Sequence, residues 1–210
     1  MLRRHLTTLL AFSALTAWAG PTLAQGTGVE LAGGVKFAPT AQVAGAPLVL
    51  NGAGIRFKFV VKVYAAGLYM TARASTAAAA LAVPGAKRIQ VTMYRDIDAN
   101  ELGRLFTRGM QDNAPKDEFS RLIPGTIKLA DIFSQRKKLL NGETFSVDFV
   151  PGQGTMVLVN GKQLGETIKE PEFFNAMLRI WLGDNPADNQ LKDALLGRKT
   201  ERAPGGQNQQ

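Results

Sequence analysis

The chain has 210 residues, a formal net charge of +8 at pH 7 and no cysteine. Its single histidine, His5, lies in the N-terminal leader described below, so the remaining residues offer neither an imidazole nor a thiolate. This excludes Ser-His-Asp and Cys-His nucleophiles, disulfide bonds and metal centres that use His or Cys ligands. The sequence contains neither a GxGxxG nor a GxxxxGK[ST] phosphate-binding motif, and we predict no metal and no cofactor. Its scattered basic residues do not predict a nucleic-acid partner, but they favour anionic ligands or an anionic membrane surface.

Residues 1–24 have the pattern of a secretory signal peptide. A basic start is followed by an apolar run from Leu6 to Trp18 and by a small-x-small cleavage site that ends at Ala24. The apolar run is shorter than the roughly 20 residues that a bilayer span requires. We therefore predict cleavage after Ala24 and, in a Gram-negative cell, a periplasmic protein with no transmembrane segment. Residues 25–197 are predicted to form one domain, and residues 198–210 a disordered polar tail.

After two short strand-like pieces between Val29 and Pro47, the stretch from Ile55 to Met70 carries the candidate functional residues. It is rich in β-branched and aromatic residues and predicts one strand. Strand alternation predicts a core face and an opposite, polar face. The predicted core face consists of Phe57, Phe59, Val61, Val63 and Ala65, and the opposite face of Arg56, Lys58, Lys62 and Tyr64. A guanidinium and a phenol on one face are hydrogen-bond donors for an anionic or carbonyl oxygen.

A straight strand, however, separates Arg56 from Tyr64. Eight residues at about 3.3 Å each span about 26 Å, so the two side chains can share a ligand only if the chain bends or reverses between them. No Gly, Pro, Asn or Asp lies between these two residues to predict a turn.

The next elements are a helix, a strand and a second helix. Alanine-rich sequence from Ser75 to Val83 predicts a short helix with Ser75 as N-cap, and the alternation from Arg88 to Tyr94 predicts a half-buried strand. The acidic segment that follows begins like a calcium loop, but Glu101 stands where such a loop needs Gly. Asp98 and Glu101 instead form a capping box at the start of an amphipathic helix.

The C-terminal half predicts further helices and a meander of strands. We predict helix from Asp117 to Leu140 with an interruption at Pro124-Gly125, three antiparallel strands, a buried helix whose aromatic residues belong to the core, and a short closing helix. The strands cover Thr144 to Val150, Thr155 to Val159 and Gln163 to Thr167, and the last two helices cover Pro171 to Leu182 and Asn189 to Leu196.

Four segments carry a resemblance to a known family. GAGIR, KVYAAGLYM, KRIQVTMYRD and FFNAMLRIWLGDNPADNQLKDALLG, in this order, are similar to segments of the chalcone isomerase-like family in its exported bacterial branch. The resemblance implies an α+β fold, an open-faced β-sandwich in which helices pack on one side of an antiparallel sheet with a cleft between them. It also implies that Arg56 and Tyr64 match the arginine and the hydroxyl-bearing residue that family members present to their ligand's oxygen.

Three functions remain open at this point. The first is a non-catalytic binding protein for a small apolar, fatty-acid-like ligand with an acidic or carbonyl head group, held by Arg56 and Tyr64. The second is a chalcone isomerase-type intramolecular lyase in which these same residues are catalytic. It is disfavoured because the plant enzymes carry Tyr and Asn in the next helix, whereas Glu101 to Gln111 contains neither. The third is an envelope interaction protein without a small ligand.

Overall fold

The computed structural model describes residues 27–198, so the predicted signal peptide and all of the predicted tail except Arg198 lie outside the described residues. The strands are β1 Val29–Leu31, β2 Val35–Phe37, β3 Thr40–Val43, β4 Ala46–Lys58, β5 Val61–Met70, β6 Lys87–Met93, β7 Ile97–Asp98, β8 Lys138–Leu139, β9 Thr144–Val150, β10 Gly154–Val159 and β11 Lys162–Ile168. The helices are α1 Ala77–Ala82, α2 Ala99–Asn113, α3 Lys116–Ser134, α4 Phe173–Leu182 and α5 Asn189–Leu195.

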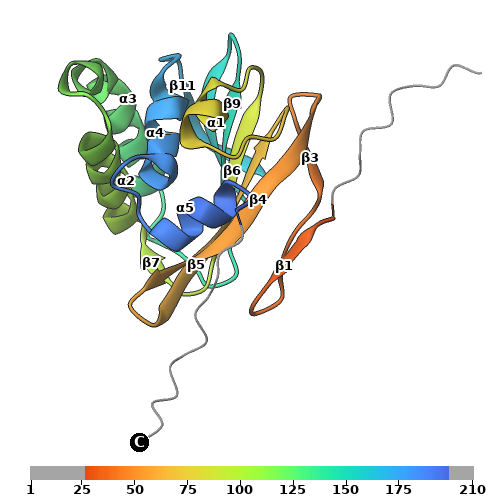
Figure 1. Ribbon diagram of the computed structural model, residues 1–210. Coiled ribbons are helices and arrows are strands. Elements are labelled where there is room, and N and C mark those ends of the chain that lie inside the picture. The colour runs from red at the N-terminus through yellow and green to blue at the C-terminus, as the bar shows by residue number, and fades with distance from the viewer. Residues whose placement is uncertain (1–26, 199–210) are drawn as a thin grey trace, which may run out of the picture.

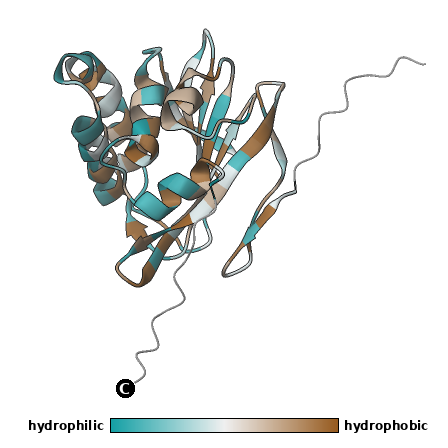
Figure 2. Cartoon of the chain, viewed as in Figure 1, coloured by the Kyte–Doolittle hydropathy of each residue, from teal (hydrophilic) through white to brown (hydrophobic). Residues whose placement is uncertain are grey.

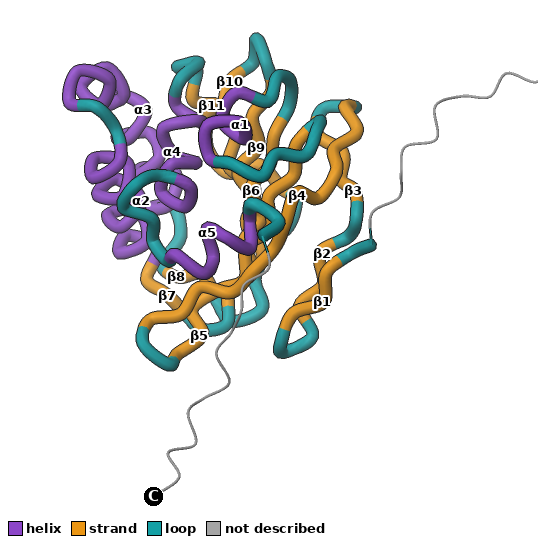
Figure 3. Tube along the Cα trace, viewed as in Figure 1, coloured by secondary structure: helices purple, strands orange, loops and turns teal. Residues whose placement is uncertain are grey.

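Seven of these strands form one antiparallel sheet in the order β11-β10-β9-β6-β5-β4-β3. The helices lie together on one side of this sheet, with α5 crossing β4 and with α3 packed at the β11 edge (Figure 1). Figure 3 shows the same division between a strand layer and a helix layer. The predicted α+β, open-faced β-sandwich is confirmed, and so is the three-stranded meander of β9, β10 and β11.

The main core fills the space between the sheet and the helices, where hydrophobic residues meet from both layers (Figure 2). Helix α4 is buried around most of its circumference, as its apolar sequence predicts. Phe106 packs edge to face with Trp181 of this helix and with Phe133, which packs in the same way with Phe145. A smaller core on the other face of the sheet contains Phe37 and Tyr69 and is packed against the β1 and β2 hairpin. The β1 and β2 hairpin that covers this core was not predicted. We expected two strand-like pieces between Val29 and Pro47, and the structure has three strands there, β1, β2 and β3.

The predicted single strand from Ile55 to Met70 is wrong. The chain reverses at Phe59 and Val60, so that β4 and β5 form a hairpin with a two-residue loop. Phe59 takes a positive φ of 56°, a conformation that Gly or Asn usually supplies, and the sequence therefore gave no turn signal. The predicted core face is wrong at the same place, because Phe59 and Val61 are exposed.

Three smaller expectations need correction. Thr76, and not Ser75, caps α1 by accepting a hydrogen bond from the Ala79 amide. Helix α3 continues through Pro124 and ends at Ser134, so the end of the predicted helical run forms β8 instead. Asp98 does cap α2, accepting from the Glu101 amide at 2.9 Å. Within residues 27–198, no helix has the length and apolar character needed to cross a membrane.

Candidate functional site

Strand β4 aims Arg56 toward the helix layer. Gly52 and Gly54 lie against α5, where a β-carbon on Gly52 would be 2.0 Å from the Ala194 carbonyl oxygen. Side chains two positions apart lie on the same face of a strand. Arg56 follows Gly54 by two positions, so its side chain points to the face on which α5 lies. The glycines bring α5 close to the sheet, and the half-buried Arg56 lies beyond them, where the segment that leads into α5 passes.

Strand β5 aims Tyr64 to the same side because its pairing with β4 contains a bulge. Arg56 is directly opposite Tyr64, but Phe57 is opposite Lys62, which leaves Val63 without a partner on β4. A bulge of this kind changes the alternation of a strand and redirects the side chains that follow. Tyr64 is consequently 2% exposed and belongs to the main core, where we had predicted it to lie opposite the core face.

The two predicted site residues converge across the hairpin. The guanidinium carbon of Arg56 lies 5.5 Å from the centre of the Tyr64 ring, an arrangement typical of a cation–π contact. The Nε atom of Arg56 is shielded from solvent and has no hydrogen-bond partner. A buried donor of this kind lowers stability unless it finds an acceptor, so the site favours a ligand that brings an oxygen atom.

Trp181 completes the polar end of the site. Its indole Nε1 donates a hydrogen bond of 2.8 Å to the Tyr64 hydroxyl oxygen. Burial raises the pKa of Tyr64, although Arg56 and the Trp181 bond act in the opposite direction. The phenol therefore stays protonated at neutral pH. Because its oxygen accepts from Trp181, its own hydrogen can be donated to a ligand oxygen.

A cavity of about 210 Å³ adjoins Arg56 and Tyr64. Helix α2 contributes half of the lining residues, α4 contributes Ile180, and the segment between α4 and α5 closes one side. The lining residues besides Arg56 and Tyr64 are Leu102, Leu105, Phe106, Arg108, Gly109, Asp112, Ile180, Asn185, Pro186 and Ala187. Polar and apolar side chains share its walls about equally, with Arg108, Asp112 and Asn185 lining it together with Leu102, Leu105, Phe106 and Ile180, which suits a small amphipathic ligand.

Hydrogen bonds hold the segment between α4 and α5 in place. Asp188 caps α5 by accepting from the Leu191 amide at 3.0 Å, and its other carboxylate oxygen accepts from the Phe57 amide on β4 at 3.0 Å. Asn113 donates to the Asn185 carbonyl oxygen and accepts from the Asn185 amide. The segment thus bridges β4, next to Arg56, and the end of α2.

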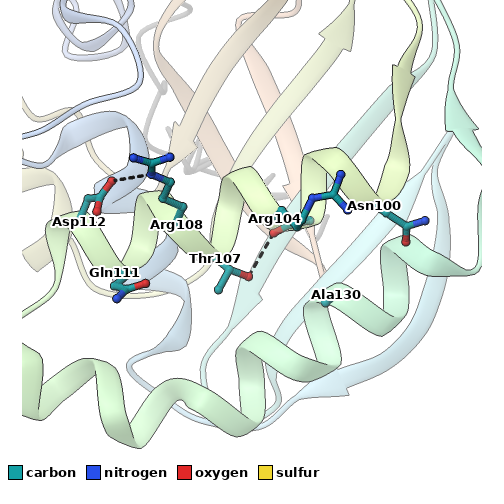
Figure 4. A pocket seen from close by; sticks show the side chains of 8 residues that line it. Asn100, Arg104, Thr107, Arg108, Gln111, Asp112 and Ala130 are labelled. Carbon is teal, nitrogen blue, oxygen red and sulfur yellow. Dashed lines mark hydrogen bonds and ion pairs between the residues drawn. The ribbon is translucent and has the colours of Figure 1, made fainter.

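A larger hollow of about 700 Å³ lies between α2 and α3, away from Arg56 and Tyr64. Its wall carries polar and charged side chains, among them Asn100, Arg104, Thr107 and Gln111 (Figure 4). Some of the polar groups there have local partners: the Thr107 hydroxyl donates to the Gly103 carbonyl oxygen, and Arg108 pairs with Asp112 at 3.7 Å. We therefore place the candidate site in the smaller cavity, which has the buried donor without a partner.

Comparison with known proteins agrees with this geometry. A sequence profile described as chalcone isomerase-like matches residues 29–197. The chain belongs to the chalcone isomerase-like family. Among solved structures, this family member resembles the fatty-acid binding protein AtFAP1 of Arabidopsis thaliana, with a TM-score of 0.64 and 16% identity over 80% of this chain and 95% of that chain. Curated proteins contain no match to the sequence. At this identity the structural likeness concerns the fold.

Sequence reasoning missed two residues of the site of this chalcone isomerase-like protein. Trp181 was predicted to be core only, although a buried indole N–H needs an acceptor and so gave a signal. Asp188 precedes the closing helix, where its N-cap role was predictable, but nothing in the sequence connects it to Phe57. Over the described part of the chain, no group of three or more His, Cys, Asp or Glu residues could hold a metal ion.

Proposed function

We propose that this protein is a non-catalytic binding protein for a small apolar ligand with an acidic or carbonyl head group, a compact fatty-acid-like molecule. The observation that carries the proposal is the buried, unpartnered Nε of Arg56 beside a cavity that also has apolar side chains in its wall. A ligand carboxylate would pair with the guanidinium, and the Tyr64 hydroxyl would donate a second hydrogen bond. The fatty-acid binding protein that shares the fold supports a ligand of this class.

The volume of the cavity limits the size of the ligand that can bind. About 210 Å³ is below the roughly 300–1,000 Å³ of a pocket for a drug-sized molecule, and buried hydrophobic side chains fill the core between sheet and helices. The cavity therefore suits the head group and the first carbons of an acyl chain. Affinity should rise by about 0.8 kcal/mol per methylene that is buried and should stop rising once the cavity is full.

The isomerase alternative is less well supported by the site. Helix α2 does contain two asparagines, which lie outside the range from Glu101 to Gln111. Asn100 belongs to the wall of the larger hollow, and Asn113 is bonded to Asn185, so neither is placed to act on a molecule beside Tyr64.

The test is calorimetric titration of straight-chain carboxylic acids and their methyl esters into wild type, Arg56→Ala and Tyr64→Phe. For the acids, Arg56→Ala should weaken binding by about 1.5–3 kcal/mol and Tyr64→Phe by about 0.5–1.5 kcal/mol. Ester binding should respond much less to Arg56→Ala, since the ester carries no charge for the guanidinium to pair.

Lys58→Ala provides a matched control, because this exposed cation lies on the same strand outside the cavity. Tyr64→Phe also removes the acceptor of the Trp181 indole, so its thermal unfolding is measured beside its affinity. Equal losses for acid and ester in Arg56→Ala would assign Arg56 a structural role. Unchanged affinity in both variants would place the ligand elsewhere and overturn the proposal.

A further inference from the structure

The loop of the β4 and β5 hairpin exposes large apolar side chains. Phe59 is 92% exposed, Val60 is 90% exposed, and the next residue, Val61, is about half exposed. Figure 2 shows this end of the hairpin as a hydrophobic projection from the molecule. We call Phe59, Val60 and Val61 the apolar tip. Three adjacent exposed side chains of this kind differ from single exposed apolar residues, which are common on protein surfaces.

The tip residues do not serve the stability of the hairpin. Phe59 adopts a φ of 56°, which is strained for a bulky residue with a β-carbon. The turn between β10 and β11 is less strained, because Asn160 and Gly161, which favour positive φ values, take values of 49° and 79° there. The turn at Phe59 lacks the Asn or Gly that such a turn favours, and it exposes apolar side chains. Departures of this kind from local sequence preference are expected at functional sites.

Cations surround the tip. Lys58 and Lys62 flank it on both strands, and the Lys62 ammonium lies 5.9 Å from the centre of the Tyr94 ring. The exposed Arg95 follows Tyr94, whose amide donates to the Val63 carbonyl oxygen, so it extends toward the same end of the sheet. The nearby acids are engaged, since the carboxylate of Asp188 accepts two backbone amides and that of Asp96 accepts from the Asn141 amide.

We propose that the apolar tip docks this protein on an anionic lipid membrane. Phe59 and Val60 enter the boundary between head groups and acyl chains, while Lys58 and Lys62 contact lipid phosphates. An apolar projection with basic residues at its base has the chemistry that peripheral proteins use at such surfaces. Arg56 lies three residues before Phe59, so docking also brings the head-group cavity toward the bilayer. That last consequence rests on the proposed function, whereas docking itself does not.

The test is co-sedimentation of the protein with vesicles of phosphatidylglycerol mixed with phosphatidylcholine, and with phosphatidylcholine alone. The variant Phe59→Asn/Val60→Gly installs the favoured Asn-Gly turn, so it should fold with an unchanged or higher melting temperature. Its partition onto the mixed vesicles should fall about tenfold or more, the factor for withdrawing one large apolar side chain. Lys58→Gln/Lys62→Gln should reduce partition about fivefold per lysine on the mixed vesicles only.

Matched controls lie on α3. Ile127 is 58% exposed, and Ile127→Gln should leave vesicle binding unchanged. Lys116→Gln/Arg121→Gln removes the same charge from exposed positions and should reduce partition less than the two tip lysines do. Titration of a soluble carboxylate without vesicles should give the same affinity for wild type and Phe59→Asn/Val60→Gly, which separates a failure of docking from a failure of the proposed function.

Three results would overturn the docking proposal. One is wild-type protein that does not sediment with the mixed vesicles, and another is tip variants that bind them as wild type does. The third is a wild-type protein that forms a dimer in sedimentation equilibrium and does not bind vesicles, together with a Phe59→Asn/Val60→Gly variant that is monomeric. In that case the tip would be the contact with a second copy of the chain.

Discussion

Lys87 is a charged residue whose burial lowers the stability of the folded protein. Lys87 is 3% exposed, and its ammonium donates to the Leu81 carbonyl oxygen at 2.7 Å and to the Asn175 side-chain oxygen at 3.3 Å. Both acceptors are neutral, and no ion pair of Lys87 occurs among residues 27–198. Burial lowers the pKa of Lys87 to about 8, because it disfavours the charged form.

This lowered pKa makes stability depend on pH. Between about pH 8 and pH 10 the unfolded chain keeps the proton on Lys87 and the folded protein releases it, so the free energy of unfolding should rise with pH there. The penalty for the buried charge is complete below about pH 8. Urea unfolding at several pH values measures the slope, which Lys87→Met should abolish and Lys169→Met, at an exposed position, should retain.

A wild-type profile that is flat across this window would contradict the assignment. Tyrosines with raised pKa values act in the opposite direction, but only at higher pH. Burial raises the pKa of Tyr69 to about 12, so its contribution to stability is lost as the pH rises through that value.

At the scale of elements, glycines decide how closely the helices approach the sheet. Helix α5 lies directly on β4, and a β-carbon on Gly52 would be 2.0 Å from the Ala194 carbonyl oxygen. A backbone atom at that distance cannot turn aside as a flexible side chain can. Gly103, inside α2, is different, because a β-carbon there would be 3.7 Å from the Cα of Ala130.

The two glycines should therefore respond oppositely to alanine. Gly52→Ala should lower the free energy of unfolding by about 1–3 kcal/mol, because α5 must move away from β4. Gly103→Ala should raise it by about 0.5–1 kcal/mol, since alanine loses less conformational freedom than glycine when a helix forms. Denaturant unfolding of both variants makes the comparison. A Gly52→Ala variant as stable as wild type would mean that α5 does not pack against β4 as described.

At the scale of the whole molecule, export remains a prediction that the described residues do not address. The basic start, the apolar run and the small-x-small site ending at Ala24 predict that the exported protein begins at Gln25. N-terminal sequencing of the product from the periplasm of a Gram-negative host tests this. A product that retains the run from Leu6 to Trp18 would make the protein membrane-anchored and would contradict the predicted localisation.

Local sequence determined most of the elements of this protein. Alternation marked β6, the Asn160-Gly161 turn fixed the pairing of β10 with β11, and Asp98 set the start of α2, since each depends on residues close in the chain. The candidate residues Arg56 and Tyr64 were also identified from sequence, with the family resemblance to guide the choice. Their proximity was not predictable, because the strained turn at Phe59 carries no turn residue.

Only the tertiary structure decided the geometry of the site. The hairpin and its bulge place Tyr64 opposite Arg56 and turn it into the core, where the Trp181 indole, 117 positions away in sequence, reaches its oxygen. The size of the cavity depends on how side chains from β4, β5, α2, α4 and the segment before α5 pack around it, which no local pattern records. Sequence thus fixed the chemistry available at the site through its residue types, whereas long-range packing fixed which groups meet and how much space they leave.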